Sequence, residues 1–131
     1  MRLPTKKSMH KKCHEAWREY IYKRDKFTCQ WCKKKKEHRE LNPHHIVPRS
    51  VCGNAGRYEV ENGITLCVGC HLYKSKTNYV EFGKFIETWL KKRGVLFEEL
   101  KLKYKGAIVK YTLFDLTLKY KILKDITRKE Q

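Results

Sequence analysis

Residues 61–71 have the sequence ENGITLCVGCH, and this stretch decides which fold the chain can adopt. Its apolar centre, residues 64–66, is typical of a short strand. The stretch ends in two cysteines with the spacing of a metal-binding knuckle, Cys67-x-x-Cys70, and residues 70–76 are compatible with a short helix. We therefore expect a strand that runs into a cysteine-bearing turn and then into a helix.

A second stretch, PHHIVPRS at residues 43–50, lies upstream and supplies the partner strand. Residues 41–48 are predicted to form this short strand, and its two prolines indicate an edge position or the ends of the element. The residues between the strands, 49–61, are predicted to be a long loop because they contain two glycines and Asn54 as turn formers. The expected order is strand, long loop, strand and short helix.

Four cysteines form two pairs with the same short spacing, Cys29-x-x-Cys32 and Cys67-x-x-Cys70. Each pair can direct two thiolates at one tetrahedral ion, and two such pairs complete a structural zinc site. Zinc chemistry tolerates the long segment between the pairs if the fold brings them together. The zinc would clamp both sides of the segment that carries His44 and His45, and its binding energy would contribute to folding.

Other interpretations of the cysteines are a redox pair or free thiols. Residues 67–71, CVGCH, also match the short pattern for c-type haem attachment. That interpretation leaves Cys29 and Cys32 unexplained, and it expects an exported protein. Cys13 and Cys52 match neither pair and are expected to be free thiols.

The chain has 131 residues and a formal net charge of +17, with 34% of its residues charged. The excess of lysine and arginine lies in the two flanks, whereas the histidine-bearing centre is close to neutral. Nucleic acid is the usual partner of such a charge, because lysines and arginines release its counterions; the alternative is a merely basic surface. No apolar run approaches the roughly 20 residues of a membrane span, and the N-terminal stretch lacks an apolar signal core. We therefore expect a cytoplasmic protein with no membrane partner.

The pattern of charge and apolar periodicity divides the chain into three parts. Residues 1–12 are expected to be a basic flexible arm, residues 13–78 a core with the cysteines and histidines, and residues 79–131 a helical C-terminal extension. Aromatic stripes on the predicted helices are interpreted as core positions rather than as base-stacking platforms. The periodicity predicts helices over residues 13–25, 79–93, 97–104 and 113–126.

Three stretches in this order, CQWC at 29–32, PHHIVPRS at 43–50 and ENGITLCVGCH at 61–71, resemble the HNH nuclease family in its zinc-bound, four-cysteine form. The resemblance covers about residues 15–76, and chains of this size are similar to small phage HNH endonucleases. It implies an α+β fold, in which a small and mainly helical domain surrounds a ββα-metal core, or His-Me finger, stabilised by the four-cysteine zinc site.

The resemblance also implies roles for four residues. His45 takes the place of the general base, and Asn62 that of the residue that ties the long loop. His44 and His71 take the places of ligands to a catalytic divalent ion. These residue types suit the chemistry, because hydrolysis of a phosphodiester needs an activated water, a base and a cation. Histidine is a suitable base near neutral pH, and neighbouring residues on a strand diverge, which fits separate roles without deciding which histidine has which.

The expected cofactors are a structural Zn²⁺ and a catalytic divalent ion. Mg²⁺ or Mn²⁺ is expected as the cellular catalytic ion, and Ni²⁺, Co²⁺ or Zn²⁺ also suits imidazole ligands. The expected partner is DNA, held mainly through its phosphates, with Arg49, Arg57 and Lys74 as candidate contacts if they are not merely surface charge. The phage resemblance adds the large subunit of a terminase as a candidate protein partner.

The function expected from these features is metal-dependent hydrolysis of DNA, with nicking or cleavage of both strands. A non-catalytic zinc-bound DNA-binding module would need the same four cysteines and the same charge. It would not need His45 and His71 with Asn62 between them. An accessory subunit of a phage DNA-packaging complex is a third interpretation, and it is compatible with nuclease activity.

Overall fold

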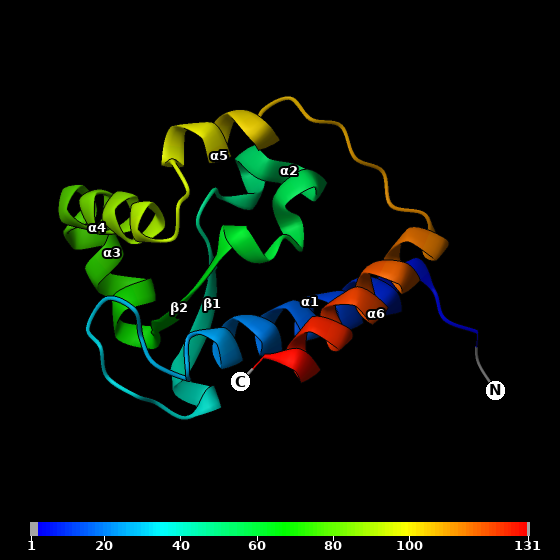
Figure 1. Cartoon of the computed structure of the whole chain (residues 1–131), viewed down its shortest axis with the longest axis horizontal. Helices are drawn as coiled ribbons and strands as arrows, with labels where there is room; N and C mark the ends of the chain where they lie inside the picture. The colour runs from blue at the N-terminus through cyan, green and yellow to red at the C-terminus, as the bar shows by residue number, and fades with distance from the viewer. Residues whose placement is uncertain (1–2, 131) are drawn as a thin grey trace.

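In the computed structural model, which describes residues 3–130, helices surround a two-stranded antiparallel sheet (Figure 1). This arrangement confirms the predicted α+β class with a mainly helical character. The elements follow one another as α1 (Lys6–Arg24), a 3₁₀ turn (His38–Glu40), β1 (Leu41–His45), α2 (Arg49–Arg57), a 3₁₀ turn (Val60–Asn62), β2 (Gly63–Cys67), a π-helical turn (Cys70–Lys74), α3 (Ser75–Thr77), α4 (Tyr79–Lys92), α5 (Phe97–Tyr104) and α6 (Leu113–Lys129).

Strands β1 and β2 form the hairpin that the sequence predicted. They pair antiparallel, with Leu41 opposite Cys67 and His45 opposite Gly63. The apolar run of β2 forms a strand because Ile64 can be buried fully against the core. The register places His45 and the second cysteine pair at opposite ends of the hairpin.

The segment between the two strands is helical, and this corrects the predicted long loop. α2 occupies most of it, and Cys52 and Gly56 are buried against the neighbouring elements. Gly53 has a φ of 53° and interrupts the helical geometry. The turn former predicted from the sequence therefore marks a kink within a helix, where the absence of a Cβ atom permits a left-handed backbone.

The start of α1 corrects the predicted flexible arm, because the chain is helical from Lys6 onward. Thr5 caps the helix: its hydroxyl accepts a hydrogen bond from the backbone N–H of Ser8 (3.1 Å), and the Ser8 hydroxyl accepts one from the N–H of Thr5 (2.9 Å). This reciprocal pair satisfies backbone donors at the N-terminus of the helix. Met9 is buried in the first turns and anchors them. Residues 1 and 2 of the predicted arm lie outside the described residues.

Helices α1 and α6 lie side by side (Figure 1), and their contact forms one apolar core. Trp17 and Ile21 of α1 pack with Leu116 and Leu123 of α6, and Tyr58 joins them from the end of α2. The end of the chain therefore covers its N-terminal helix. The predicted division into a core and an extension at residue 78 stays a prediction.

A second apolar core lies between the hairpin, α4 and α5. The buried face of α4 presents Ile86, Trp89 and Leu90 to this core. Cys29 and Cys70 belong to the same core, so the cysteine-bearing turns are part of its packing. Within the described residues, no helix is long and apolar enough to cross a membrane.

Asp25, at the end of α1, is a buried carboxylate that ties this helix to β2. Arg24 holds both of its oxygens, at 2.9 and 3.0 Å, and the backbone N–H of Thr65 donates to it at 3.0 Å. Arg24 also donates to the carbonyl oxygens of Val60 and Gly63, at 2.8 and 2.7 Å. Two adjacent charged residues in a charged helix are typical of an exposed surface, so the sequence did not single out this pair.

Replacing Asp25 with asparagine is expected to lower the free energy of unfolding by about 3–5 kcal/mol, because Arg24 would lose its buried counter-charge. Chemical denaturation of the zinc-loaded variant measures this change. The matched control is Glu98→Gln, which breaks an exposed ion pair with Lys101 and is expected to change the free energy of unfolding by less than about 1 kcal/mol. Equal losses in the two variants would show that the buried pair has no special structural role.

Candidate metal centres and active site

The structure brings the two predicted cysteine pairs together into one cluster. The four Sγ atoms all lie within 4.8 Å of one another, and those of Cys32 and Cys67 are 3.8 Å apart. In a tetrahedron with zinc–sulfur bonds of about 2.3 Å, the sulfur atoms are about 3.8 Å apart. The cluster therefore has the dimensions and the donor set of a structural zinc site. The predicted grouping is confirmed for Cys29, Cys32, Cys67 and Cys70.

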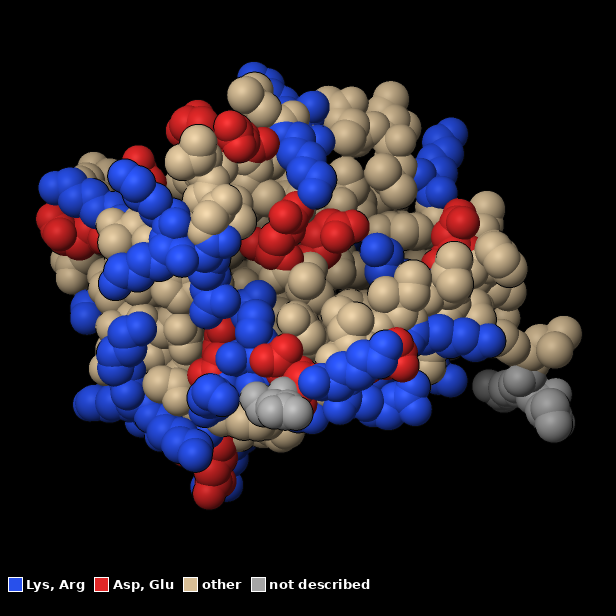
Figure 2. All heavy atoms as spheres, in the orientation of Figure 1, with Lys and Arg blue, Asp and Glu red and all other residues tan. Residues whose placement is uncertain are grey.

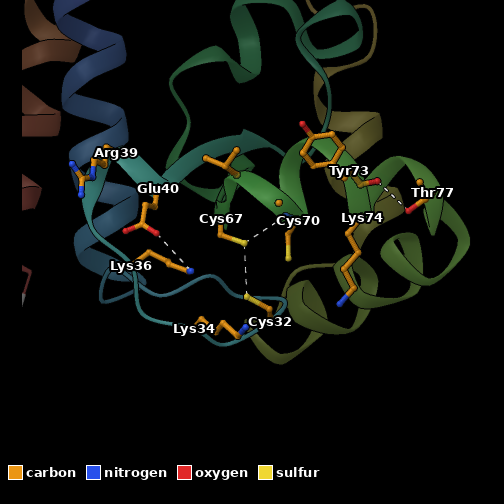
Figure 3. A pocket seen from close by; sticks show the side chains of 12 residues that line it. Cys32, Lys34, Lys36, Arg39, Glu40, Cys67, Cys70, Tyr73, Lys74 and Thr77 are labelled. Atoms are coloured by element: carbon orange, nitrogen blue, oxygen red, sulfur yellow. Dashed lines mark hydrogen bonds and ion pairs between the residues drawn. The ribbon is translucent and has the colours of Figure 1, made fainter.

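Two tight backbone turns present these thiols. Lys33 has a φ of 65°, and its N–H donates to the carbonyl oxygen of Cys29 (2.9 Å), which closes the first turn. At the second turn, the backbone N–H of Cys70 donates to the sulfur of Cys67 (3.4 Å). Figure 3 shows the Cys67 side chain directed toward Cys32 on the facing loop, with Cys70 beside it. Burial raises the pKa of the Cys29 and Cys70 thiols, so a bound cation is needed to hold them as thiolates.

His44 and His71 lie next to each other on the side of the hairpin that faces α4. Their ring centroids are 5.2 Å apart, with an angle of 74° between the rings. The ring of Phe82, from α4, lies 5.5 Å from that of His44. His44 comes from β1 and His71 from the π-helical turn directly after Cys70. The cysteine cluster therefore helps to set the position of His71.

Both of these imidazoles are suited to bind a cation. Nδ1 of His71 is buried and has no hydrogen-bond partner among the described residues, an arrangement that a bound ion would satisfy. Burial, with the neighbouring His71 and His45, lowers the pKa of His44 to about 4. Burial, with Lys76, also lowers the pKa of His71. Neutral imidazole is the form that binds metals, and within residues 3–130 no third histidine, cysteine or carboxylate completes a cluster with this pair.

His45 points to the other side of the strand, against α1. Its ring stacks on Trp17, with 4.3 Å between the ring centroids and 13° between the planes. Its Nε2 lies 3.0 Å from the backbone carbonyl oxygen of Arg57. Because a carbonyl oxygen only accepts hydrogen bonds, Nε2 carries the proton and Nδ1 keeps its lone pair. Burial lowers the pKa of His45 against the effect of this hydrogen bond, and the charges of Arg49 and Arg57 lower it further.

Asn62 is fully buried and links the ends of the segment between the strands. Its Oδ1 accepts a hydrogen bond from the N–H of Val47 (2.7 Å), and its Nδ2 donates to the carbonyl oxygens of Val47 (3.2 Å) and Gly56 (3.0 Å). Gly56 directly precedes Arg57, whose carbonyl oxygen holds the His45 ring. The Asn62 amide therefore fixes the backbone that orients His45.

Gly63, directly after Asn62, is a position whose role sequence reasoning missed. A Cβ atom there would overlap the side chains of Ile21 and Trp17. The missing side chain lets α1 approach the hairpin at the residue paired with His45. The asparagine–glycine pair is visible in the sequence, but the helix that covers it is not.

The three predicted phosphate contacts lie in two places. Arg49 and Arg57, at the two ends of α2, line a hollow beside α1. Lys74 lies over the ring of Trp31, 4.6 Å from its centroid, in a separate hollow beside the cysteine cluster (Figure 3). Two of the candidate phosphate contacts, Arg49 and Arg57, therefore lie on the His45 side of the molecule, and Lys74 lies beside the four-cysteine cluster.

Charge is unevenly distributed over the surface. On the face shown in Figure 2, lysines and arginines gather over the end that holds α3 and α4 and along α6, whereas carboxylates gather between α2 and α6. Two carboxylates that follow α2 in the sequence form ion pairs, Glu59 with Lys119 at 3.4 Å and Glu61 with Lys103 at 2.5 Å.

Comparison with known proteins gives one family. Residues 29–77 match the family model described as HNH endonuclease. The matched segment contains both cysteine pairs, the hairpin, α2 and the three histidines, whereas α1 and α4 to α6 lie outside it. No curated protein and no solved structure matches the chain.

Proposed function

We propose that the protein, whose residues 29–77 match the model of the HNH endonuclease family, is a metal-dependent endonuclease that hydrolyses phosphodiester bonds in DNA. The observation that carries the proposal is the pair of neutral imidazoles, His44 and His71, beside the imidazole of His45, whose Nδ1 keeps its lone pair because Nε2 donates to Arg57. These are the groups that metal-assisted hydrolysis requires.

His44 and His71 would hold the catalytic ion. Mg²⁺ and Mn²⁺ are the expected ions, and Ni²⁺, Co²⁺ or Zn²⁺ also suits imidazole. The buried Nδ1 of His71, which lacks a partner among residues 3–130, supports this assignment. When bound, the ion supplies charge stabilisation to the phosphate and the leaving oxygen. The cysteine cluster is the separate, structural zinc site.

His45 is the proposed general base. Its Nδ1 accepts a proton from the attacking water, because its Nε2–H is committed to the carbonyl oxygen of Arg57. The water oxygen forms a bond to phosphorus while the bond from phosphorus to one backbone oxygen breaks. That oxygen leaves with the bonding electrons and takes up a proton from solvent water to become a hydroxyl end. Trp17 holds the His45 ring by stacking, and Asn62 acts as a positioning residue through the Gly56–Arg57 backbone.

DNA is the proposed substrate because a net charge of +17 suits a polyanion. We expect binding through phosphates with weak sequence preference, since strong preference needs side chains aimed at base edges. The resemblance to small phage endonucleases supports a more specific form of the proposal, in which the protein acts in the host cytoplasm beside a terminase large subunit. Copurification of such a subunit would test that form.

A non-catalytic zinc-bound DNA-binding module is the competing function. It accounts for the cysteine cluster and for the positive charge. It gives no reason for a buried Nδ1 of His71, beside His44, that lacks a hydrogen-bond partner in the described part of the chain.

Cleavage of supercoiled plasmid by the zinc-loaded protein tests the proposal. With Mg²⁺ or Mn²⁺ we expect nicked or linear DNA, and without an added divalent ion we expect the plasmid to stay supercoiled. Binding of DNA without cleavage, in the presence of each divalent ion named above, would favour the non-catalytic module.

A further inference from the structure

A basic hollow lies between the N-terminal half of α1 and α2, outside the histidine pair and the cysteine cluster. Its volume is about 870 Å³. A single carboxylate, that of Glu15, lines it together with two histidines. The positive charges around it come from Lys6, Lys7, Lys11, Arg18, Arg49 and Arg57.

These charges are largely uncompensated. Arg18 lies 3.8 Å from Glu19, and the other five cations have no ion-pair partner within residues 3–130. Like charges around one hollow repel one another, and a bound anion relieves that repulsion. The hollow therefore has the electrostatic character of a binding site for anions.

Two residues that line the hollow lie close to the surroundings of His45. Arg57, on one wall, provides the carbonyl oxygen that holds the His45 ring. His14, on the other wall, lies 5.7 Å from the ring of Trp17, on which His45 stacks. Burial first, and then nearby charges that include Arg49 and Arg57, lower the pKa of His10 and of His14, so both histidines are neutral beside the cations.

The length of the α1 wall indicates the kind of anion. Lys7, Lys11 and Arg18 fall within about 40° of one another around the helix at 100° per residue, so they share one side. At a rise of about 1.5 Å per residue, Lys7 and Arg18 are about 16 Å apart along the helix axis. Successive phosphates of one DNA strand are about 3.4 Å apart along the duplex axis, so this wall spans several of them. A single free phosphate would reach only part of the wall.

We propose that this hollow is a groove for the backbone of one DNA strand, which it leads along α1 and α2 to His45. The inference rests on the proposed nuclease function and extends it to α1, which lies outside the matched segment. α1 then adds a binding surface for DNA phosphates that lies outside the matched residues 29–77.

A variant with Lys7→Gln, Lys11→Gln and Arg49→Gln tests the groove. Its DNA affinity is measured by fluorescence anisotropy of a labelled duplex over a range of NaCl concentrations, with zinc-loaded protein and no catalytic ion. Each lost phosphate contact reduces the slope of log affinity against log salt by about 0.9, so the three changes should reduce it by about 2–3. At physiological salt this corresponds to a roughly 10²-fold loss of affinity.

The matched control removes the same charge from exposed positions outside the hollow, with Lys91→Gln, Lys92→Gln and Lys121→Gln. We expect the control to keep a salt slope close to that of the wild type. Zinc content and melting temperature show that both variants are folded. In plasmid cleavage, the groove variant should raise KM, because these side chains bind the strand.

An unchanged salt slope in the groove variant, or an equal loss in both variants, overturns the groove even if the protein cleaves DNA. A reduced slope in the groove variant alone supports it. The anisotropy measurement requires no cleavage, so it tests the groove separately from the nuclease function. A wild type that binds DNA through this groove and never cleaves it would overturn the proposed endonuclease function but support the DNA-binding groove.

Discussion

Glutamine in place of His45 is expected to lower the rate of DNA cleavage by roughly 10²- to 10⁴-fold, the range that a general base contributes. A glutamine amide can still donate a hydrogen bond to the Arg57 carbonyl oxygen, but it has no nitrogen that accepts a proton from water. The variant should therefore fold like the wild type but lose most of its DNA-cleavage activity. The measurement is the initial rate of conversion of supercoiled plasmid at saturating Mn²⁺.

The control for this variant is His38→Gln, which replaces an exposed histidine that lies 3.3 Å from Glu19 and outside the candidate site. It should cleave at the wild-type rate. Both variants should keep the zinc content and the melting temperature of the wild type. A folded His45→Gln variant with a near wild-type cleavage rate would exclude His45 as the base.

Serine in place of Cys70 is expected to abolish cooperative folding. Structural zinc binds small domains with apparent free energies of about 10–16 kcal/mol at neutral pH, which equals or exceeds the usual stability of about 5–15 kcal/mol. Cys70 is buried in the same core as Ile64 and Leu66, so loss of the ion would disturb the packing of the hairpin. Zinc content per chain and thermal unfolding followed by circular dichroism measure the effect.

The matched control is Cys13→Ser, because Cys13 is buried between α1 and α6 and outside the cysteine cluster. Its thiol donates to the carbonyl oxygen of Leu116 (3.2 Å), a bond that a serine hydroxyl can also make. This variant should keep one zinc per chain and a cooperative transition. A Cys70→Ser variant that melts like the wild type would contradict a structural role for the cluster.

The hairpin and the cysteine cluster could be predicted because their signals are local. The apolar run before Cys67 indicates a buried strand, and the two equal cysteine spacings indicate one tetrahedral site. α2 was not predicted because its glycines are turn formers, and only the folded chain shows that Gly53 bends a helix instead of ending it. The start of α1 was missed because Thr5 and Ser8 form their capping box without the glutamate or glutamine that usually marks one.

The contacts that shape the candidate site depend on elements that are distant in the sequence. Trp17 stacks on His45 because α1 packs across that end of the sheet. Gly63 allows this close packing because it has no side chain that would overlap α1. The hydrogen bond from His45 to Arg57 depends on the path of α2. Residue types and spacing therefore predicted which side chains carry the chemistry, whereas the packing that orients them required the fold.

The Mn²⁺ dependence of plasmid cleavage, for the zinc-loaded wild type and for His71→Ala, tests the central claim most directly. We expect wild-type cleavage to rise to saturation with added Mn²⁺. His71→Ala should retain its zinc and its fold and show no saturable activation, because one of the two imidazole ligands is gone. Equal activation curves for the two proteins, or a folded wild type that cleaves with no divalent ion supplied, would contradict the account.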